Sequence, residues 1–287
     1  MYQSIIAEMR PQQWTKNLLI YAAILFGGSM FALEQAFLAT EAFVAFCLAS
    51  SGVYFINDIA DREKDRQNPQ KSSRPIAAGK ISLPLAFVCA ILLFVGGGQI
   101  AYLVNVNCFF LILSYVLLNI CYTLWLKHIV IIDVLVVAAG FVLRAVMGAT
   151  AVNMHMTMWF LLCVMFLSLF LALGKRRHEL AAVEDHAIVE GRKVLQFYSI
   201  ELIDQLMTIV TAALLICYAL FTVDSHTKNH EIMAYTVPMA LYGIFYYLYV
   251  VRVKQGGGSP DEALYKEKPI LVVVLLYLVS IIVIRNL

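Results

Sequence analysis

The chain has 287 residues, of which 62% are hydrophobic and only 14% are charged, and its mean hydropathy is +0.81. A composition this apolar excludes a soluble globular domain and predicts a protein that crosses a membrane several times. The formal net charge of +2 is small and gives no indication of a nucleic-acid partner. The six cysteines stand singly in apolar segments, which argues against a disulfide framework or a thiolate metal site.

The first predicted element is residues 1–17, where Tyr2, Ile5, Ile6 and Met9 recur with the spacing of one helix face. We expect a short amphipathic helix along the membrane surface, and the mixed polar character of the segment argues against a cleavable signal peptide. This segment is followed by apolar stretches whose lengths are close to the roughly 20 residues that a bilayer requires. They predict nine transmembrane helices, near residues 18–34, 39–57, 83–104, 108–126, 129–152, 156–173, 205–223, 234–251 and 269–286.

Because helices satisfy their own backbone hydrogen bonds in lipid, the predicted fold class is all-α, a single integral-membrane bundle over residues 1–287. Lysine and arginine are divided unevenly between its two sides: 18 fall on the side of the N-terminus and two on the other. This bias predicts a cytoplasmic N-terminus and an external C-terminus. The active site is then expected on the cytoplasmic connections, which are residues 58–82, 174–204 and 252–268.

The segment from Asn57 to Asp65 places three carboxylates at the end of the second predicted span. On a continuous helix Asp58, Asp61 and Asp65 would share one face. Carboxylate oxygens suit Mg²⁺, which proteins usually hold with one or two carboxylates and the phosphates of a substrate. A solvated acidic helix end is the alternative. The neighbouring lysines and arginines favour a metal–diphosphate site.

Basic residues on the cytoplasmic side are candidates to bind phosphate groups. Lys71 and Arg74 precede a Pro-Ile-Ala-Ala-Gly segment that should break the helix and return both side chains toward the aspartates, although a plain connector is the alternative. Tyr122 and Lys127 follow the fourth span, where an interfacial aromatic and a snorkelling lysine explain them equally well.

Two further groups of charges lie on the fifth and sixth spans. Asp133 and Arg144 are three helical turns apart and so share a face. Because charges at membrane depth usually face a polar cavity, we expect Arg144 to line the site or its lipid entrance, with a structural ion pair as the alternative. The sixth span ends in three consecutive basic residues, Lys175, Arg176 and Arg177, of which at least one should face the interior of the bundle.

These features together resemble the UbiA superfamily of intramembrane prenyltransferases over essentially the whole chain. The superfamily signature Asn-Asp-x-x-Asp-x-x-x-Asp matches Asn57, Asp58, Asp61 and Asp65. Within the superfamily the chain is most similar to the decaprenyl-phosphate phosphoribosyltransferases. The matching features are Arg10-Pro11-x-Gln13-Trp14-x-Lys16-Asn17, Lys127 followed by Asp133, Gly140-Phe141-Val142-Leu143-Arg144, Gly174-Lys175-Arg176-Arg177-x-Glu179 and Pro260-x-Glu262.

The resemblance implies transfer of 5-phosphoribose from phosphoribosyl diphosphate (PRPP) to a polyprenyl phosphate of the decaprenyl type, with release of diphosphate. It implies Mg²⁺, with Mn²⁺ as the alternative ion, a place in the bacterial inner membrane and a role in making the cell envelope, and it leaves a homo-oligomer open. The three aspartates would hold the metal. The predicted substrate-binding residues are Lys16, Asn57, Lys71, Arg74, Tyr122, Lys127, Arg144, Lys175, Arg176 and Arg177.

One departure from the superfamily bears on this interpretation. Most members carry a second aspartate motif after the sixth span, where this chain has its three basic residues and only later Glu184 and Asp185. We expect basic contacts to replace part of a second metal site. The alternative enzyme is a prenyltransferase that moves a polyprenyl group from its diphosphate to an aromatic acceptor. A non-catalytic transporter or lipid carrier would be supported by inverted repeats with broken helices, and the sequence has no clear internal repeat.

Overall fold

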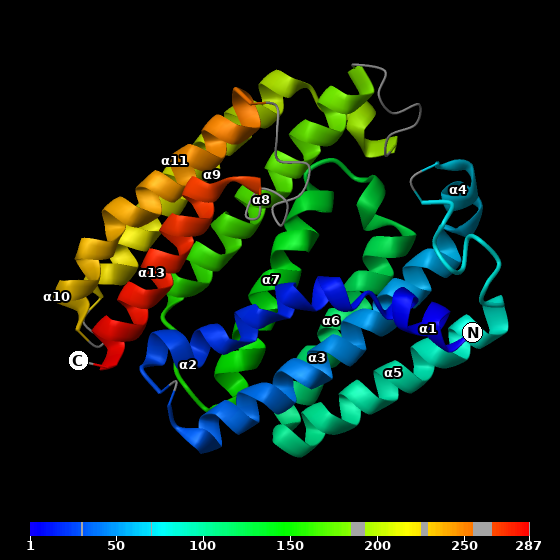
Figure 1. Ribbon diagram of the computed structural model, residues 1–287, viewed down its shortest axis with the longest axis horizontal. Helices are drawn as coiled ribbons and strands as arrows, with labels where there is room; N and C mark the ends of the chain where they lie inside the picture. Colours follow the sequence, from blue (N-terminus) through cyan, green and yellow to red (C-terminus); the bar gives the residue numbers. More distant parts are fainter. Residues whose placement is uncertain (30, 70, 185–192, 225–228, 255–265, 287) are drawn as a thin grey trace. The chain divides into compact units, whose positions relative to one another are not determined.

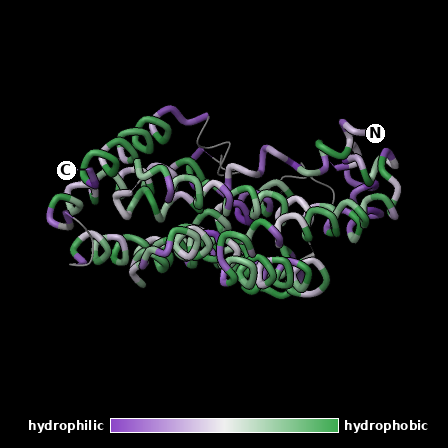
Figure 2. The backbone as a smooth tube through the Cα atoms, turned by 90° about the horizontal axis from the view of Figure 1, so that it is seen from below, coloured by the Kyte–Doolittle hydropathy of each residue, from purple (hydrophilic) through white to green (hydrophobic). Residues whose placement is uncertain are grey.

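The computed structural model describes residues 1–29, 31–69, 71–184, 193–224, 229–254 and 266–286 (Figure 1). In this part of the chain all regular secondary structure is helical, which confirms the predicted all-α class. Eight helices are long and apolar enough to cross a membrane, and Figure 2 shows that hydrophobic residues cover most of their length. They are α3 (Leu33–Ala60), α5 (Leu83–Val104), α6 (Val106–Leu124), α7 (Ile132–Ala151), α8 (Met158–Glu184), α9 (Ile200–Val223), α11 (Val237–Arg252) and α13 (Lys268–Asn286). The seventh of these spans includes two short elements before α11, namely α10 (His230–Met233) and η4 (Ala234–Thr236).

The first predicted span, residues 18–34, is not among these eight helices. The chain there forms a 3₁₀ helix, η1 (Pro11–Tyr21), and then a short α-helix, α2 (Ala22–Gly27). Gly28 follows in the left-handed conformation (φ +73°), which ends a helix. The described residues therefore hold eight long membrane helices where nine were predicted, because the first apolar stretch is divided between two helix types.

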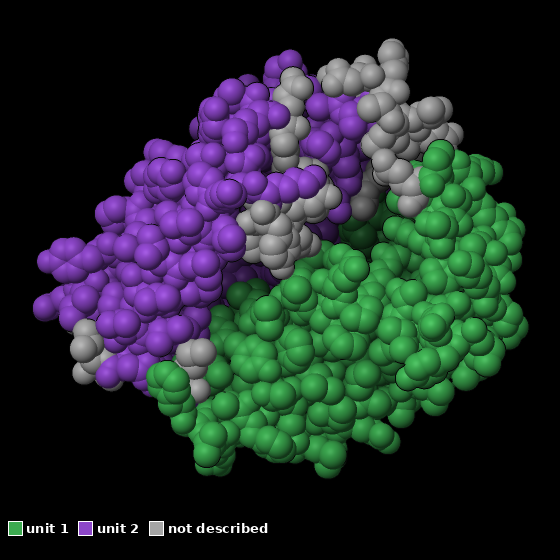
Figure 3. Space-filling view, in the orientation of Figure 1, with its two compact units in different colours: residues 1–24, 30–127, 143–154 green, residues 25–29, 128–142, 155–287 purple. Residues whose placement is uncertain are grey.

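The chain folds as two compact units, which are coloured separately in Figure 3. Unit 1 comprises residues 1–24, 30–127 and 143–154; unit 2 comprises residues 25–29, 128–142 and 155–287. Helix α7 contributes its beginning to unit 2 and its end to unit 1.

Unit 1 is built on α3 and α5, which lie side by side (Figure 1). Small residues allow the close approach: a Cβ added to Gly97 of α5 would lie 2.7 Å from the carbonyl oxygen of Ala45. The same is true where α7 meets η1, because a Cβ on Gly148 would lie 2.0 Å from the carbonyl oxygen of Ile20. The first contact joins α5 to α3 and the second joins α7 to η1, and η1 itself also packs on α3.

A small core lies at the end of α3 that carries the acidic motif. Phe55 is completely buried and packs with Ile76 of the following connection and with the first turns of α5. The first helix, α1 (Tyr2–Met9), adds Ile5 and Met9 to the same cluster. The predicted helix over residues 1–17 is therefore present only as far as Met9, because Arg10 breaks it and η1 follows, and Ile5 and Met9 cover the end of α3. Its position along the membrane surface stays a prediction.

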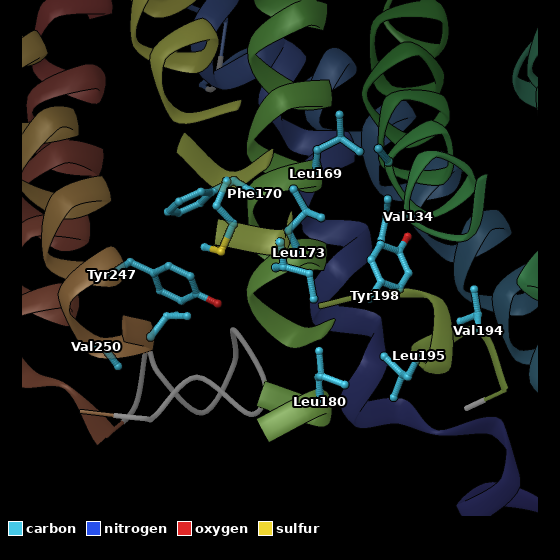
Figure 4. Packing of buried hydrophobic residues seen from close by; sticks show 14 of the residues in the cluster. Val134, Leu169, Phe170, Leu173, Leu180, Val194, Leu195, Tyr198, Tyr247 and Val250 are labelled. Carbon is cyan, nitrogen blue, oxygen red and sulfur yellow. The ribbon is translucent and has the colours of Figure 1, made fainter. Parts of the chain in front are cut away.

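Unit 2 has its own core, which is formed by α7, α8, α9, α11, α13 and η3 (Lys193–Phe197). Figure 4 shows Tyr247 of α11 beside Phe170 of α8, with ring centroids 5.1 Å apart. Tyr198, which follows η3, is also buried in this core. The core sets the position of the basic residues at the end of α8.

Candidate functional site

The acidic motif lies where α3 ends and α4 (Arg62–Gln67) begins. Asp58 is in the last turn of α3, Asp61 is the residue between the two helices (φ −95°, ψ 5°), and Asp65 is in α4. The continuous helix on which the three carboxylates would share one face is not formed, since α3 ends at Ala60. Hydrogen bonds from Asp61 N to Asn57 O (2.9 Å) and from Asp65 N to Asp61 O (2.8 Å) nevertheless carry the chain across the break.

Asp58 and Asp65 converge on one guanidinium group. Nη1 of Arg74 donates to Oδ1 of Asp58 at 3.2 Å and to Oδ2 of Asp65 at 2.6 Å. Both aspartates are buried, at 2% and 3% exposure, and Lys71 lies 4.0 Å from Asp65. The connection after α4 thus returns its basic residues to the aspartates, as the proline and glycine predicted.

Asp61 has a different partner. Nζ of Lys127 donates to both of its carboxylate oxygens, at 2.7 and 2.9 Å. Asn57 links the motif to α6, because its amide donates to Asp58 at 3.3 Å and its oxygen accepts from Thr123 at 3.4 Å. Tyr122, one residue before Thr123, is half-buried on α6.

Arg10 is a site residue whose role sequence reasoning missed, although it belongs to a matched motif. It ends α1 in the left-handed conformation (φ +53°), and Nη2 of its guanidinium donates to Asp58. The guanidinium also lies 4.9 Å from the ring centroid of Tyr54. The contact joins residues 48 positions apart, so no local pattern could have revealed it.

Glu8 is the second missed residue. It is 1% exposed, and neither carboxylate oxygen has a hydrogen-bond partner among the described residues. Burial and the neighbouring carboxyl group of Asp58 raise the pKa of Glu8 to about 8. The one available sequence signal was an acidic residue between the apolar positions of an amphipathic helix.

The chemistry of the donor set fits a divalent ion in part. Among the described residues no three His, Cys, Asp or Glu side chains are arranged to hold a metal. However, two buried carboxylates already share one positive group, and Mg²⁺ is commonly held by one or two carboxylates together with substrate phosphates. The pair Asp58 and Asp65 is therefore a suitable protein contribution to such a site.

The rest of the N-terminal segment is fastened to α3. Nε1 of Trp14 donates to Oγ of Ser51 at 3.1 Å, and that hydroxyl donates to the carbonyl oxygen of Met9 at 2.9 Å. Asn17 is completely buried and donates to Ser50 at 3.3 Å. Lys16, a predicted substrate-binding residue, is half-buried on the same segment.

Arg144 lies inside the core of unit 1. Its Nε donates to Asn17 at 2.8 Å and its Nη2 donates to the hydroxyl of Tyr115 at 3.0 Å. The guanidinium also lies about equally close to the rings of Phe46 and Tyr115, 5.0 and 4.9 Å from their centroids. With 6% exposure, Arg144 fastens η1 to the core of unit 1. Its role in lining the site or the lipid entrance stays a prediction.

In unit 2 the basic residues at the end of α8 have carboxylate partners of their own. Nε of Arg176 donates to Asp133 at 2.8 Å, and its Nη1 donates to Glu179 at 2.8 Å. The hydroxyl of Tyr198 donates to Asp133 at 2.8 Å, and burial together with that carboxylate raises the pKa of Tyr198 to about 12. Arg176 is 3% exposed, so one of the three basic residues does face the interior.

Arg177 pairs with Asp204 at 2.9 Å and donates to the carbonyl oxygen of Val251. Lys175 is half-buried. The assignment of these residues to phosphate binding stays a prediction. The Glu184 side chain, Asp185 and the Pro260-x-Glu262 segment lie outside the described residues.

Comparison with known proteins extends these findings. The model of the UbiA prenyltransferase family matches residues 18–264. A decaprenyl-phosphate phosphoribosyltransferase of Mycolicibacterium smegmatis is 34% identical, with 96% of this chain and 91% of the relative covered. One from Corynebacterium glutamicum is 33% identical, with 97% and 85% covered. A UbiA homologue from Archaeoglobus fulgidus, solved with GPP and Mg²⁺, has a TM-score of 0.72 at 18% identity. The match covers 99% of this chain and 100% of the homologue, and it shows that the two proteins share a fold.

Proposed function

The chain belongs to the UbiA prenyltransferase family, and from that premise we propose that it is a membrane phosphoribosyltransferase. It transfers 5-phosphoribose from PRPP to a polyprenyl phosphate and releases diphosphate. The names of relatives that align with nearly the whole chain support this substrate pair over prenyl transfer to an aromatic acceptor. The structural observation that carries the proposal is the pair of buried carboxylates, Asp58 and Asp65, that share the guanidinium of Arg74.

Asp58 and Asp65 are the residues that would hold Mg²⁺, with Mn²⁺ as the alternative ion. An ion held by these two carboxylates would supply positive charge for the diphosphate leaving group. Asp61, which pairs with Lys127 in the described structure, remains the predicted third ligand.

The basic side chains supply the phosphate contacts. Arg10 and Arg74 are about one quarter exposed, at 24% and 26% of their side chains, so they can pass from carboxylates to an incoming phosphate. A guanidinium binds either group in a bidentate manner. Lys71, on the same connection as Arg74, lies 4.0 Å from Asp65, and Lys127, which follows α6, pairs with Asp61. An anionic substrate and its cation would therefore replace ion pairs that already exist.

The acceptor requires no general base. Its nucleophile is a phosphate oxygen, which is ionised at neutral pH, and positive charge develops on the ribose as in other glycosyl transfers. The protein then contributes positioning and electrostatic stabilisation. Lys16 and the basic group of residues 175–177 are the predicted contacts for the phosphate ends.

The proposed orientation has the N-terminus and the acidic motif in the cytoplasm of a bacterial inner membrane and the C-terminus outside. The uneven distribution of lysine and arginine supports it. An odd number of crossings is then required, so η1 and α2 must cross as well as the eight long helices. At about 2.0 Å per residue in a 3₁₀ helix and 1.5 Å in an α-helix, these elements extend about 30 Å, the thickness of the hydrocarbon core.

Fusion of alkaline phosphatase to the C-terminus tests this orientation. The fused reporter should be active, and an inactive reporter would contradict an external C-terminus.

The function is tested with the purified full chain in detergent, decaprenyl phosphate and PRPP labelled in the ribose. We expect label to enter the lipid phase only with a divalent ion, and Asp61→Ala to abolish the transfer while the protein still folds. Glu63→Gln is the matched control, because Glu63 is an exposed acid on α4 that contacts only Arg62 and Arg66 among its described ion pairs. Label that joins an aromatic acceptor from prenyl diphosphate, and none from PRPP, would overturn the proposal.

A further inference from the structure

The beginning of α9 and the end of α11 form a surface cavity in unit 2 that the proposed function does not use. It has a volume of about 450 Å³ and is lined by Asp204, Gln205, Thr208, Ile209 and Arg252. All of these residues except Ile209 are polar or charged, although both helices are apolar enough to cross a membrane. Polar groups that converge at the end of membrane helices need a reason to be there, and a ligand is one such reason.

Arg252 joins the two helices at this cavity. Its Nη2 donates to the carbonyl oxygen of Asp204 at 2.7 Å and to Oγ1 of Thr208 at 3.0 Å, and its Nε lies 3.3 Å from the carboxylate of Asp204. These contacts use the edge of the guanidinium that Nε and Nη2 form, and no described residue accepts a hydrogen bond from Nη1. The side chain is 35% exposed. The guanidinium is therefore held in place and still presents donors to a ligand.

The charges around the cavity favour an anion. Arg177 of α8 pairs with the carboxylate of Asp204 at 2.9 Å, so two guanidinium groups share this one carboxylate. Glu201, one turn earlier on α9, is exposed and does not line the cavity. The exposed amide of Gln205 adds a neutral donor. An excess of one positive charge beside an amide donor suits a phosphate group.

The faces of α9 and α11 beyond the cavity favour the phosphate of a lipid over a soluble one. The two helices lie side by side, because Arg252 joins them at one end and the hydroxyl groups of Tyr218 and Thr236 are hydrogen-bonded near the other. On the membrane side of the cavity the exposed side chains are apolar, with Ile209 and Ile216 on α9 and Phe245 on α11. A lipid whose phosphate lies at Arg252 would have its acyl chains on these residues.

Tyrosines on α11 place the cavity at the membrane boundary. The rings of Tyr242, Tyr246 and Tyr249 follow one another within two turns of Arg252, with centroids 5.9 and 5.7 Å apart. Tyrosine is enriched at the level of the lipid headgroups, where its ring is in the apolar layer and its hydroxyl is in the polar one. The hydroxyl of Tyr246 accordingly lies 3.4 Å from the ammonium group of Lys254, which is exposed. Headgroup phosphates are therefore at the depth of Arg252.

We propose that this cavity binds the phosphate group of a membrane phospholipid, with Arg252 as the main contact and the acyl chains along the exposed faces of α9 and α11. None of the residues that line the cavity is assigned to the proposed phosphoribosyl transfer. The lipid is thus a structural ligand of unit 2, which it would hold together where α9 and α11 meet the membrane surface.

The test uses dioleoyl phosphatidylglycerol as the probe. The purified full chain is delipidated in detergent, and binding of added lipid is measured by native mass spectrometry. We expect one lipid to bind the wild type more tightly than any further lipid. Arg252→Met should weaken this first binding about tenfold or more, because it removes a charged hydrogen bond to phosphate. Lys254→Met is the matched control, since Lys254 is an exposed cation nearby that pairs with Glu267, and it should bind as the wild type does.

A second variant guards against a folding defect in Arg252→Met. Thr208→Val removes the hydroxyl that holds the guanidinium and changes no charge, so it should weaken the first binding while its thermal midpoint stays near that of the wild type. Wild-type lipid affinity in folded Arg252→Met, or in Thr208→Val if the former does not fold, overturns the proposal. Inorganic phosphate that displaces the lipid at equal concentration would assign the cavity to a soluble phosphate. Decaprenyl phosphate that binds there more tightly, and depends on Arg252, would assign it to the acceptor; both results overturn a phospholipid site.

Discussion

Each unit contains a group of ion pairs, and the two groups differ in how they are enclosed. In unit 1 Asp58 and Asp65 are buried, but their partners Arg10 and Arg74 are about one quarter exposed. In unit 2 both Asp133 and Arg176 are sealed, with side chains 0% and 4% exposed. Tyr198 completes that second group with a neutral hydroxyl.

The difference separates exchangeable charges from structural ones. A partly exposed cation that bridges two carboxylates can be replaced by a metal ion and can itself move to a phosphate. A sealed pair has no such route, and removing one partner leaves an uncompensated charge in a low-dielectric interior. We therefore expect the group with partly exposed cations, rather than the sealed pair, to serve the proposed transfer.

The largest effect is expected at the exchangeable group. Asp58→Asn should lower the turnover about a thousandfold, equivalent to about 4 kcal/mol of transition-state stabilisation, because it removes half of the carboxylate pair. The measurement is transfer of label from PRPP to decaprenyl phosphate at saturating substrate. Turnover within tenfold of the wild type would show that Asp58 is not required for the reaction. The proposed functional difference between the two groups of ion pairs would then be wrong.

The next effect concerns stability in unit 2. Arg176→Met should destabilise the protein by about 3–5 kcal/mol, since it leaves Asp133 buried without its charge partner. Arg177→Met is the matched variant, and it should cost about 1 kcal/mol because Asp204 is partly exposed and keeps Arg252. Thermal midpoints from circular dichroism in detergent compare the two. Equal midpoints would mean that the Asp133 pair is not a sealed structural group.

A smaller effect is expected when the bridging geometry changes and the charge does not. Arg74→Lys should raise the KM for PRPP about tenfold with little change in stability, because an ammonium group cannot span two carboxylates or a phosphate as a guanidinium does. Arg66→Lys is the control, since Arg66 contacts only Glu63 and the carbonyl oxygen of Ala77 among its described contacts. Similar KM values for the two variants would show that bidentate contact is unimportant at Arg74.

The smallest effect is expected at the surface pair of Lys254 and Glu267, whose charged atoms are 2.7 Å apart. The lysine lowers the pKa of Glu267, so the stability that this pair contributes is present above the ordinary glutamate pKa and is lost as the pH falls through the lowered value. At pH 7, Lys254→Met should lower the thermal midpoint by an amount near the limit of detection. At pH 3, the same substitution should leave the thermal midpoint unchanged. A clear shift at both pH values would assign Lys254 a role other than this ion pair.

Sequence reasoning captured what depends on local composition. Apolar length gave the membrane helices, and the proline and glycine after Arg74 correctly predicted its return to the aspartates. The division of the first apolar stretch into η1 and α2 was missed, because a hydropathy pattern does not distinguish a 3₁₀ from an α-helix. The contacts of Arg10, Glu8 and Arg176 were missed because they join residues distant in sequence, and only tertiary packing decides which charges meet.

The 3₁₀ form of η1 has a consequence for how this segment can change. With three residues per turn, Trp14, Asn17 and Ile20 align along a single edge, and each is held there by a polar bond or complete burial. Substitutions on the other two edges leave that alignment intact. Insertion of a single residue between Trp14 and Asn17 would rotate Asn17 and Ile20 by a third of a turn away from their contacts. We therefore expect this segment to tolerate substitutions on its other edges but not insertions.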